Sequence, residues 1–501
     1  MNQTLHYKIL TIAIVSAFST TVQADETNPS EQLKKLQQMV EQLQQQRAEQ
    51  DKQMDLLTKE LVSIENQLTQ SKIIKVEEKG ASKSVPVLAN FKDGINFEDG
   101  SGNWKFAING RVQTDYRKFS PDETAADTFS LRRARLGGTL TFYKDYVARV
   151  EGEYSGGSTT LTYGYIDINK FQSAKFRLGQ FKPNYGLERA MSTNFTDFQE
   201  RSMADTLLGS IFDRGVMVYG SPFAGLNYSV AYVNGTGTGD ENNAKNDGKD
   251  FTIRVTGNLA EMMDWKDAVV HVGGFYAEGS EGSRNQAAFI PVGQTEGRGA
   301  QFFNTSCSAA ACGAATANGF KDNVNRRRAG FETALAYQAV KVQGEYINSS
   351  FEGAGYSRDI DAWYASAMWN VTGEEFSDMY KEGVFGRLKP KNNFKTGTGW
   401  GALQVGARYS NFDASDFNTT NAAGTGVLLS APTLLTEGLL VATNKADAWT
   451  LGANWILNPN VRLMANYIRT DYATPILVRI NGVNKSLDKE DALTMRAQFD
   501  F

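Results

Sequence analysis

Histidine, cysteine and proline are scarce in this chain of 501 residues, which has 2 His, 2 Cys and 10 Pro. Histidine and cysteine are common transition-metal ligands, and histidine is the commonest general base, so we expect neither a metal centre nor a cofactor. No apolar run after Ala24 is long enough for a membrane-spanning helix. The formal net charge is only −4, which argues against nucleic acid as a partner.

Glycine and aromatic residues are abundant, with 47 Gly, 29 Phe and 20 Tyr. This composition is typical of many short β-strands with aromatic residues near their ends. The only long apolar stretch, residues 9–18, follows Lys8 and precedes small residues at Val22 and Ala24. A basic start, a short apolar core and a small-x-small site predict a cleavable signal peptide over residues 1–24. An N-terminal membrane anchor is the alternative, but the stretch is too short to span.

Residues 25–76 carry a different pattern, in which apolar residues recur at alternating three- and four-residue steps. This heptad pattern predicts an α-helical coiled coil, which we place in the periplasm. A coiled coil needs a partner helix, so the segment indicates self-association; a lone amphipathic helix on a surface is the alternative. A linker is expected over residues 77–104. The seam positions are Leu33, Leu36, Val40, Leu43, Met54, Leu57, Leu61, Ile64 and Leu68.

From residue 105 to residue 501, apolar and polar residues alternate with the two-residue period of β-strands. In FAINGRVQTDY, for example, Ile108 and Val112 share one face while Arg111 and Gln113 share the other. Charges on the second face suit a water-filled lumen better than a soluble sandwich, the competing fold. We predict an all-β fold, a 16-stranded antiparallel transmembrane β-barrel over residues 105–501, preceded by the coiled coil. The predicted strands cover residues 105–118, 129–143, 146–155, 159–168, 175–182, 213–220, 225–234, 250–259, 267–277, 327–337, 341–350, 359–370, 400–410, 447–457, 461–471 and 491–501.

The connections between the predicted strands alternate between short turns and long polar loops, as is typical of membrane barrels. The loop at residues 278–326, which we expect on the extracellular side, holds both Cys307 and Cys312. In an exported protein this pair most simply forms a disulfide. Zinc binding is the alternative, although no further Cys or His lies nearby.

Four regions of the chain are similar to the phosphate- and polyphosphate-selective outer-membrane porins, the O/P porins. The resemblance runs in order from residue 105 to residue 501, and the third region is the most specific. It implies a sixteen-stranded barrel, a homotrimer, and passive diffusion of small anions, with phosphate or polyphosphate among them. The regions are SLRRARLGG (130–138) with YKDYVARVEGEYSGG (143–157), GQFKPNYGLE (179–188) with QERS (199–202), VTGEEFSDMYKEGVFGRLKPKNNF (371–394), and WILNPNVRLMANYIR (455–469).

Arginine suits an anion pathway because its planar guanidinium donates to two oxygens at once. The family's arginine ladder maps best onto Arg133 and Arg135, which lie within the first similar region. The two-residue period alone assigns the other arginines to the lumen. For each of them the alternative is an ion pair with a lumen carboxylate, such as Glu151 or Glu153, that stiffens the wall. The lumen arginines are Arg111, Arg117, Arg133, Arg135, Arg149, Arg254, Arg408 and Arg496.

By strand count the third external loop covers residues 183–212, and in porins this loop usually folds inward and narrows the pore. The basic constriction candidates in and beside it are Lys182, Arg189, Arg201 and Arg214. Phosphate-selective members of the family place lysines at the constriction, whereas Thr193 and Asn194 occupy the middle of this loop. This departure indicates a modest anion preference or a broader solute range.

Two further functions stay open on the sequence alone: a non-selective general porin, and a barrel that serves mainly as an envelope tether or adhesin. An enzyme is not expected, because the only histidine after the signal peptide, His271, lies in a predicted strand without a convincing serine or acid partner. The expected partners are other copies of the chain, outer-membrane lipid and small anionic solutes. The expected location is the outer membrane of a Gram-negative bacterium.

Overall fold

The computed structural model describes residues 87–91, 94–122, 124–235, 237–238, 249–281, 292–304, 324–353, 356–417, 438–480 and 483–501. The predicted signal peptide, the predicted coiled coil and both cysteines lie outside these residues. The described part of the expected linker is not irregular chain, because Val87–Asn90 (β1) and Ile95–Asp99 (β2) form a hairpin whose second strand pairs with the first barrel strand. None of the helices in the described ranges is long and apolar enough to cross a membrane.

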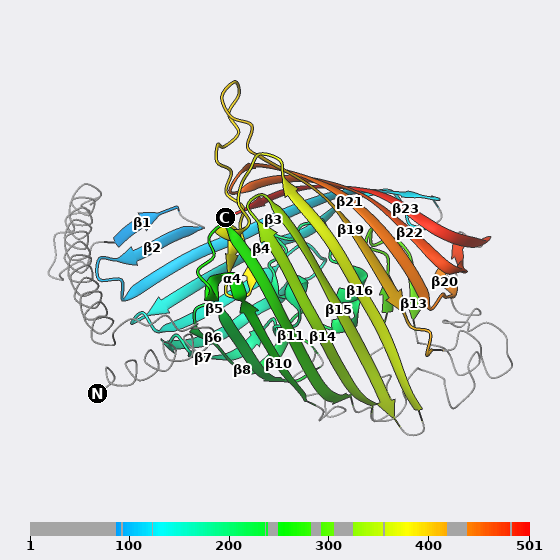
Figure 1. Ribbon diagram of the computed structural model, residues 1–501, viewed down its shortest axis with the longest axis horizontal. Coiled ribbons are helices and arrows are strands. Elements are labelled where there is room, and N and C mark those ends of the chain that lie inside the picture. Colours follow the sequence, from blue (N-terminus) through cyan, green and yellow to red (C-terminus); the bar gives the residue numbers. More distant parts are fainter. Residues whose placement is uncertain are drawn as a thin grey trace, which may run out of the picture. The chain divides into compact units, whose positions relative to one another are not determined.

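Sixteen strands within the described residues form one closed antiparallel barrel, as predicted (Figure 1). Each strand pairs with the next barrel strand, and the last pairs with the first. Gly110 and Phe501 exchange two backbone hydrogen bonds of 3.0 Å at this closure. The barrel strands are Trp104–Ser120 (β3), Thr128–Phe142 (β4), Tyr146–Glu153 (β5), Thr160–Phe171 (β6), Ala174–Phe181 (β7), Asp213–Phe223 (β8), Leu226–Val233 (β9), Asp250–Asn258 (β10), Ala268–Glu281 (β11), Val324–Tyr337 (β14), Val340–Gly353 (β15), Tyr356–Asn370 (β16), Ala402–Asp413 (β19), Lys445–Asn458 (β21), Val461–Ile480 (β22) and Val483–Asp500 (β23).

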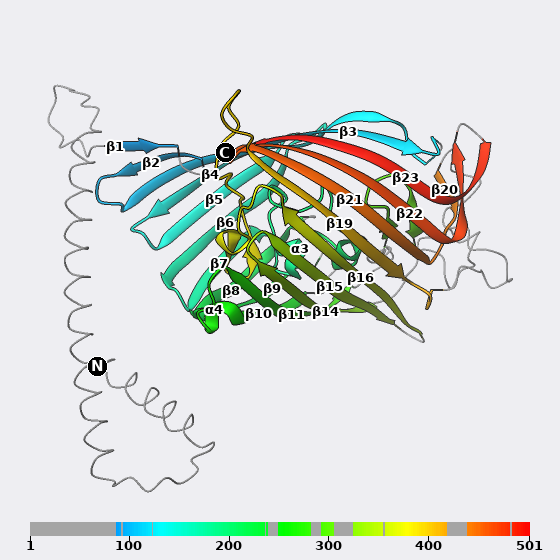
Figure 2. The ribbon, with the colours of Figure 1, turned by 45° about the horizontal axis from the view of Figure 1, so that its top comes forward.

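The remaining elements are short and lie in the connections between barrel strands. Two of the helices belong to the segment between β7 and β8, residues 182–212, which we call loop 3. Figure 2 shows the first of them, α3, within the ring of strands. These elements are Leu187–Ala190 (α3), Met203–Leu208 (η1), Leu259–Met262 (α4), Val292–Gln294 (β12), Gln301–Asn304 (β13), Ser377–Met379 (η2), Tyr380–Lys381 (β17), Val384–Phe385 (β18) and Gly438–Val441 (β20).

The predicted alternation of apolar and polar residues separates the two faces of the barrel wall. On β3, Val112 is 45% exposed on the outer face, whereas Gln113 and Asp115 are fully buried on the inner face. A barrel gives every strand a partner on both sides, which is the arrangement a hydrocarbon environment demands because unpaired backbone groups cost several kcal/mol there. The alternation in the sequence and the closed backbone hydrogen bonding therefore both indicate a barrel with an apolar outer face and a polar inner face.

The barrel interior is largely filled along one side. Two hydrophobic clusters pack connecting segments against the inner wall: Leu207 of loop 3 belongs to one with Phe302 and Phe412, and Leu187 of loop 3 belongs to the other with Phe376. Such packing of connections takes up part of the barrel interior. The candidate functional site lies where loop 3 meets the inner wall.

Candidate functional site

Loop 3 lies inside the barrel and hydrogen-bonds to more than one strand of the wall. The Thr193 side chain and carbonyl accept hydrogen bonds from Arg111 (2.8 Å) and Gln113 (3.1 Å) on β3. Farther along, the Asp197 carbonyl accepts a 2.8 Å hydrogen bond from Asn454 on β21. These bonds hold the middle of the loop inside the barrel, where the constriction is expected.

Two of the predicted lumen arginines, Arg117 on β3 and Arg496 on β23, pair with the same carboxylates. Arg496 forms a 2.7 Å ion pair with Asp115, and the same carboxylate lies 2.7 Å from Arg117. Arg496 also contacts Glu200 of loop 3 at 2.8 Å, and Arg117 contacts the same carboxylate at 3.2 Å. They are therefore lumen-facing, as predicted, and part of an ion-pair network.

Arg135 and Arg149 lie nearer the turn end, by which we mean the barrel end with the short Asn458–Val461 connection. Arg135 pairs with Glu153 at 2.7 Å, and Arg149 pairs with Glu151 at 2.7 Å. The Arg149 guanidinium also stacks over the Tyr163 ring, 4.3 Å from its centroid. Stacking on an aromatic face fixes the direction of a guanidinium without neutralising its charge.

Arg254 on β10 and Arg408 on β19 both bond to connecting segments that lie inside the barrel. Arg254 pairs with Glu332 at 2.8 Å, and Arg408 pairs with Glu188 at 2.9 Å and with Glu296 at 2.6 Å. These acceptors come from a wall strand, from loop 3 and from the connection between β11 and β14. The two arginines therefore tie the filling segments together, which is the structural alternative considered for them.

Arg111 and Arg133 are the lumen arginines with the weakest pairing. Arg111 has no carboxylate within ion-pair distance among the described residues and donates to Thr193 instead. Arg133 donates to Gln113 at 2.8 Å and lies 3.8 Å from Glu200. Their positive charges are thus less neutralised than those of the other predicted lumen arginines.

The four constriction candidates mainly hold loop 3 together. The Lys182 ammonium donates to three consecutive carbonyls, residues 189–191, at 2.8–2.9 Å. Arg189 pairs with Asp205 at 2.5 Å, and Arg201 donates to the Glu188 carbonyl at 3.1 Å. Arg214 donates to Gln180 on the neighbouring strand. Contact of these side chains with a permeating solute stays a prediction, because their described partners are protein groups.

A β-bulge brings one arginine into the lumen that strict alternation places outside. Gln113 on β3 opposes Arg133, but the next residue, Thr114, opposes Leu131, so Arg132 is an extra residue on β4. A bulge re-aims the side chains beside it. The Arg132 Nε consequently donates to Glu200 at 2.8 Å. No feature of the sequence marks this bulge.

Lys175 and Arg177 on β7 also belong to the lumen and were not among the predicted residues. Arg177 pairs with Asp167 at 2.7 Å and stacks over the Tyr165 ring at 3.9 Å. The Tyr219 hydroxyl accepts a hydrogen bond from Arg177 (3.2 Å) and donates one to Asp167 (2.9 Å). The alternation in AKFRLGQF, with Lys and Arg on one face and Phe and Leu on the other, contains the signal for both cations.

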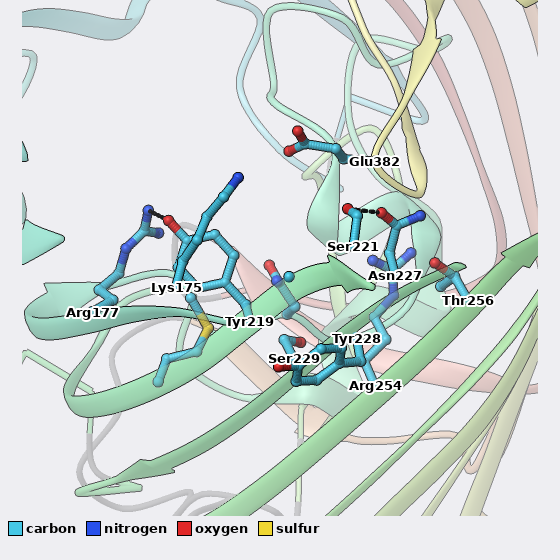
Figure 3. A pocket seen from close by; sticks show the side chains of 13 residues that line it. Lys175, Arg177, Tyr219, Ser221, Asn227, Tyr228, Ser229, Arg254, Thr256 and Glu382 are labelled. Carbon is cyan, nitrogen blue, oxygen red and sulfur yellow. Dashed lines mark hydrogen bonds between the residues drawn. The ribbon is translucent and has the colours of Figure 1, made fainter. Parts of the chain in front are cut away.

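These two cations border a cavity of about 140 Å³ between β7–β10 and the segment at residues 371–401 (Figure 3). The side chains of Arg254 and Thr256 line the cavity from β10, and Glu382 lines it from residues 371–401. The lining is mostly polar, which suits water and small hydrophilic solutes. The cavity therefore lies between the inner wall and residues 371–401, near the turn end.

Residues 371–401 are an exception to the short turns predicted at this end of the barrel. They contain the most specific similar region and reach the inner wall. The Gly383 carbonyl accepts a 3.0 Å hydrogen bond from Arg254, and Tyr380 hydrogen-bonds His271 at 2.6 Å. His271 is buried and lies 3.3 Å from Glu332, so within the described chain its contacts are with the wall and this long turn.

The lumen face of β3–β7, which we call the basic wall, carries twice as many cations as carboxylates. The wall's carboxylates are Asp115, Glu151, Glu153 and Asp167. Its cations are Arg111, Arg117, Arg132, Arg133, Arg135, Arg149, Lys175 and Arg177. An excess of one sign of charge along a confined passage attracts solutes of the opposite sign.

Comparisons with known proteins give a family match, a relative and similar solved structures. The model of a family described as phosphate-selective porin O and P matches residues 106–501. Porin O of Pseudomonas aeruginosa is 26% identical over 441 residues, which cover 83% of this chain and 92% of that protein. Among solved structures, OprB of Pseudomonas putida (TM-score 0.49, 9% identity) covers 80% of this chain and 94% of its own. The outer membrane protein OmpT of Vibrio cholerae (TM-score 0.46, 13% identity) covers 80% and 98%. Because the family model spans most of the sequence, the chain belongs to the phosphate-selective porin O and P family of outer-membrane porin channels.

Proposed function

We propose that this protein conducts small anions by passive diffusion through its lumen, with a modest preference for anions over cations and with inorganic phosphate among its solutes. The observation that carries the proposal is the basic wall, where eight cations face four carboxylates. An anion that enters the barrel loses part of its hydration, and guanidinium donors replace those hydrogen bonds. The family description, which names phosphate, supports the same direction.

The arrangement of the basic wall suits transit rather than tight binding. Neighbouring cations are linked through shared groups: Arg135 and Arg149 both contact Glu151, and the Tyr163 ring over which Arg149 stacks contacts the Tyr165 ring. An anion can thus pass from one partly neutralised guanidinium to the next. Conduction requires contacts that attract the solute and still release it.

A weakly selective general porin is the second candidate, and a specific observation favours it. Most lumen arginines already pair with a carboxylate, as Arg135 does with Glu153 at 2.7 Å. Each such pair lowers the charge that a solute meets. This candidate predicts nearly equal permeability for small anions and cations.

The predicted coiled coil and the family resemblance support a proposal for the oligomeric state. We propose a homotrimer in the outer membrane, with residues 25–76 of three chains associating in the periplasm, because a heptad seam is stable only against partner helices. Cross-linking of the purified protein in mild detergent tests this assembly. A product of three chains is expected, and a strictly monomeric product contradicts it.

Reversal potentials in planar bilayers test the anion preference. The wild-type channel is expected to show anion-selective reversal potentials in a KCl gradient. Replacing both Arg133 and Arg135 by Gln is expected to lower that selectivity. Arg327→Gln, which removes an exposed arginine paired with Glu352, is the control and should leave it unchanged.

Three other outcomes contradict the proposal in different ways. Cation-preferring wild-type currents reject anion selectivity and keep the porin. Unchanged selectivity in the double arginine variant rejects the role of the basic wall. A folded protein with no conductance favours the tether or adhesin.

A further inference from the structure

One carboxylate of loop 3, Glu200, is surrounded by four arginines from three wall strands. Its two oxygens lie 2.8 Å from Arg132 Nε, 2.8 Å from Arg496, 3.2 Å from Arg117 and 3.8 Å from Arg133. Arg132 meets both oxygens with its fork, through Nε and Nη2. Such convergence of guanidiniums on one small acceptor is the geometry of an oxyanion receptor.

The positive charge of this cluster exceeds its negative charge. In the described residues, Asp115 is the only other carboxylate that pairs with these four arginines, through Arg496 and Arg117. Four guanidiniums therefore share two carboxylates. The Arg117 Nε is buried and has no hydrogen-bond partner in the described part of the chain, so donor capacity remains unused.

The charge excess also shifts the pKa of two groups that lie outside the wall strands. Burial by itself raises the pKa of the Glu200 carboxyl, but Arg132, Arg133 and Arg496 outweigh it and hold that pKa well below its usual value. Burial lowers the pKa of Arg298 in the connection between β11 and β14, and repulsion from Arg132 adds to this effect. Arg298 therefore contributes a fifth positive charge beside the cluster.

We propose that Glu200 is a built-in competitor of the permeating anion: its carboxylate occupies an oxyanion site formed by Arg117, Arg132, Arg133 and Arg496 and so limits how tightly the channel binds an oxyanion such as inorganic phosphate. The inference rests on the proposed anion channel and names the residue that sets its selectivity. A carboxylate and a phosphate both present oxygens to guanidinium forks, so only one of them can use the same donors at a time.

The location of Glu200 permits this competition. The Arg132 side chain is 23% exposed, more than those of the other three arginines, so it is the most accessible part of the cluster. The backbone of loop 3 is held independently of the Glu200 side chain, because Arg496 donates to the Gln199 carbonyl (2.6 Å) and Arg408 to the Glu200 carbonyl (3.1 Å). Neutralising the carboxylate therefore leaves the loop anchored and the four guanidiniums in place.

Planar-bilayer recordings of the full-length protein with Glu200→Gln test the proposal. Inorganic phosphate is titrated against a constant KCl current, and the concentration for half-inhibition is compared with wild type. We expect that concentration to fall on the order of tenfold, because an anion no longer competes with an internal carboxylate. Glu200→Asp, which keeps the charge, is expected to resemble wild type.

Two further variants separate a local site from a general change in charge. Glu153→Gln makes the same charge change on the basic wall but frees only one arginine, Arg135, so it should lower the half-inhibiting concentration clearly less than Glu200→Gln does. Adding Arg132→Gln to Glu200→Gln should remove the gain in phosphate affinity. Heat-dependent gel mobility of the barrel checks that each variant is folded.

The outcomes distinguish this inference from the proposed function. Equal effects of Glu200→Gln and Glu153→Gln, or no effect of Glu200→Gln in a folded channel, overturn the competitor role. Tight phosphate inhibition of the wild type also overturns it. A cation-selective wild type overturns the proposed anion preference, whereas a gain of phosphate inhibition in Glu200→Gln still supports the site.

Discussion

The Glu345 carboxylate on β15 accepts a 2.6 Å hydrogen bond from the backbone N–H of Glu188 in loop 3. Its other oxygen accepts a 2.9 Å bond from the Leu187 N–H, and the Tyr364 hydroxyl adds a 2.7 Å bond. A single buried side chain of the wall thus receives the first N–H groups of the short helix α3, which otherwise lack partners. This contact helps to determine where the loop lies in the lumen.

Replacing Glu345 by Ala is expected to loosen loop 3. Three buried donors lose their acceptor, and each unsatisfied buried donor costs about 1–3 kcal/mol. We expect a lower unfolding temperature in detergent and more frequent conductance fluctuations in single-channel recordings. Glu352→Ala on the same strand is the control, since that side chain is 52% exposed and pairs only with the exposed Arg327. If the single-channel steps of Glu345→Ala fluctuate no more than those of the wild type, the anchoring role is contradicted.

The approach of α3 to Glu345 also depends on Gly186. This residue has a φ of +36°, and a Cβ built on it would overlap the Glu345 carboxylate. Gly186→Ala is therefore expected to displace the loop, with conductance changed in the same direction as by Glu345→Ala. Gly157→Ala serves as control, because no atom lies within 4 Å of its added Cβ. If Gly186→Ala and Gly157→Ala have the same conductance, the predicted displacement of the loop is contradicted.

A buried ion pair also anchors loop 3, through Asp197, to strand β15. Lys341 on β15 contacts both oxygens of Asp197, at 2.7 and 2.9 Å, and its ammonium lies 4.3 Å from the centroid of the Phe385 ring. Removing one buried partner leaves an uncompensated charge and costs about 3–5 kcal/mol. Lys341→Met is thus expected to destabilise the barrel more than the double variant Lys341→Met, Asp197→Leu. Thermal unfolding in detergent measures both, and equal loss in the two variants argues against a tightly coupled pair.

The depressed pKa of Glu200 predicts a pH dependence. Its ordinary value is 4.5, and the folded value lies well below it. The ion pairs of Glu200 therefore stabilise the folded loop fully above pH 4.5, and this contribution is lost only as the pH falls through the lower, folded pKa. We expect the reversal potentials of wild type and Glu200→Gln to differ still at pH 4.5. Convergence of the two proteins near pH 4.5 is the contradicting result.

Much of the fold follows from the sequence because strand alternation is a local property. The outward Leu136 and the inward Arg135 are adjacent residues, and their faces follow from the two-residue period alone. The same period places loop 3 at residues 183–212, one residue from its observed start. The inward Arg132 shows the limit, because the bulge beside it exists only in the pairing of β3 with β4.

The sequence by itself determined the number of strands, their inner and outer faces and the inward direction of the predicted arginines. Only the tertiary structure decided which charges meet: Lys182 and Arg189 bind the backbone and acids of their own loop, while Glu200 collects four arginines from strands far apart in the chain. The physical reason is that side-chain direction depends on neighbouring backbone geometry, whereas the partner of a charge depends on barrel closure and on the path of a loop through the lumen.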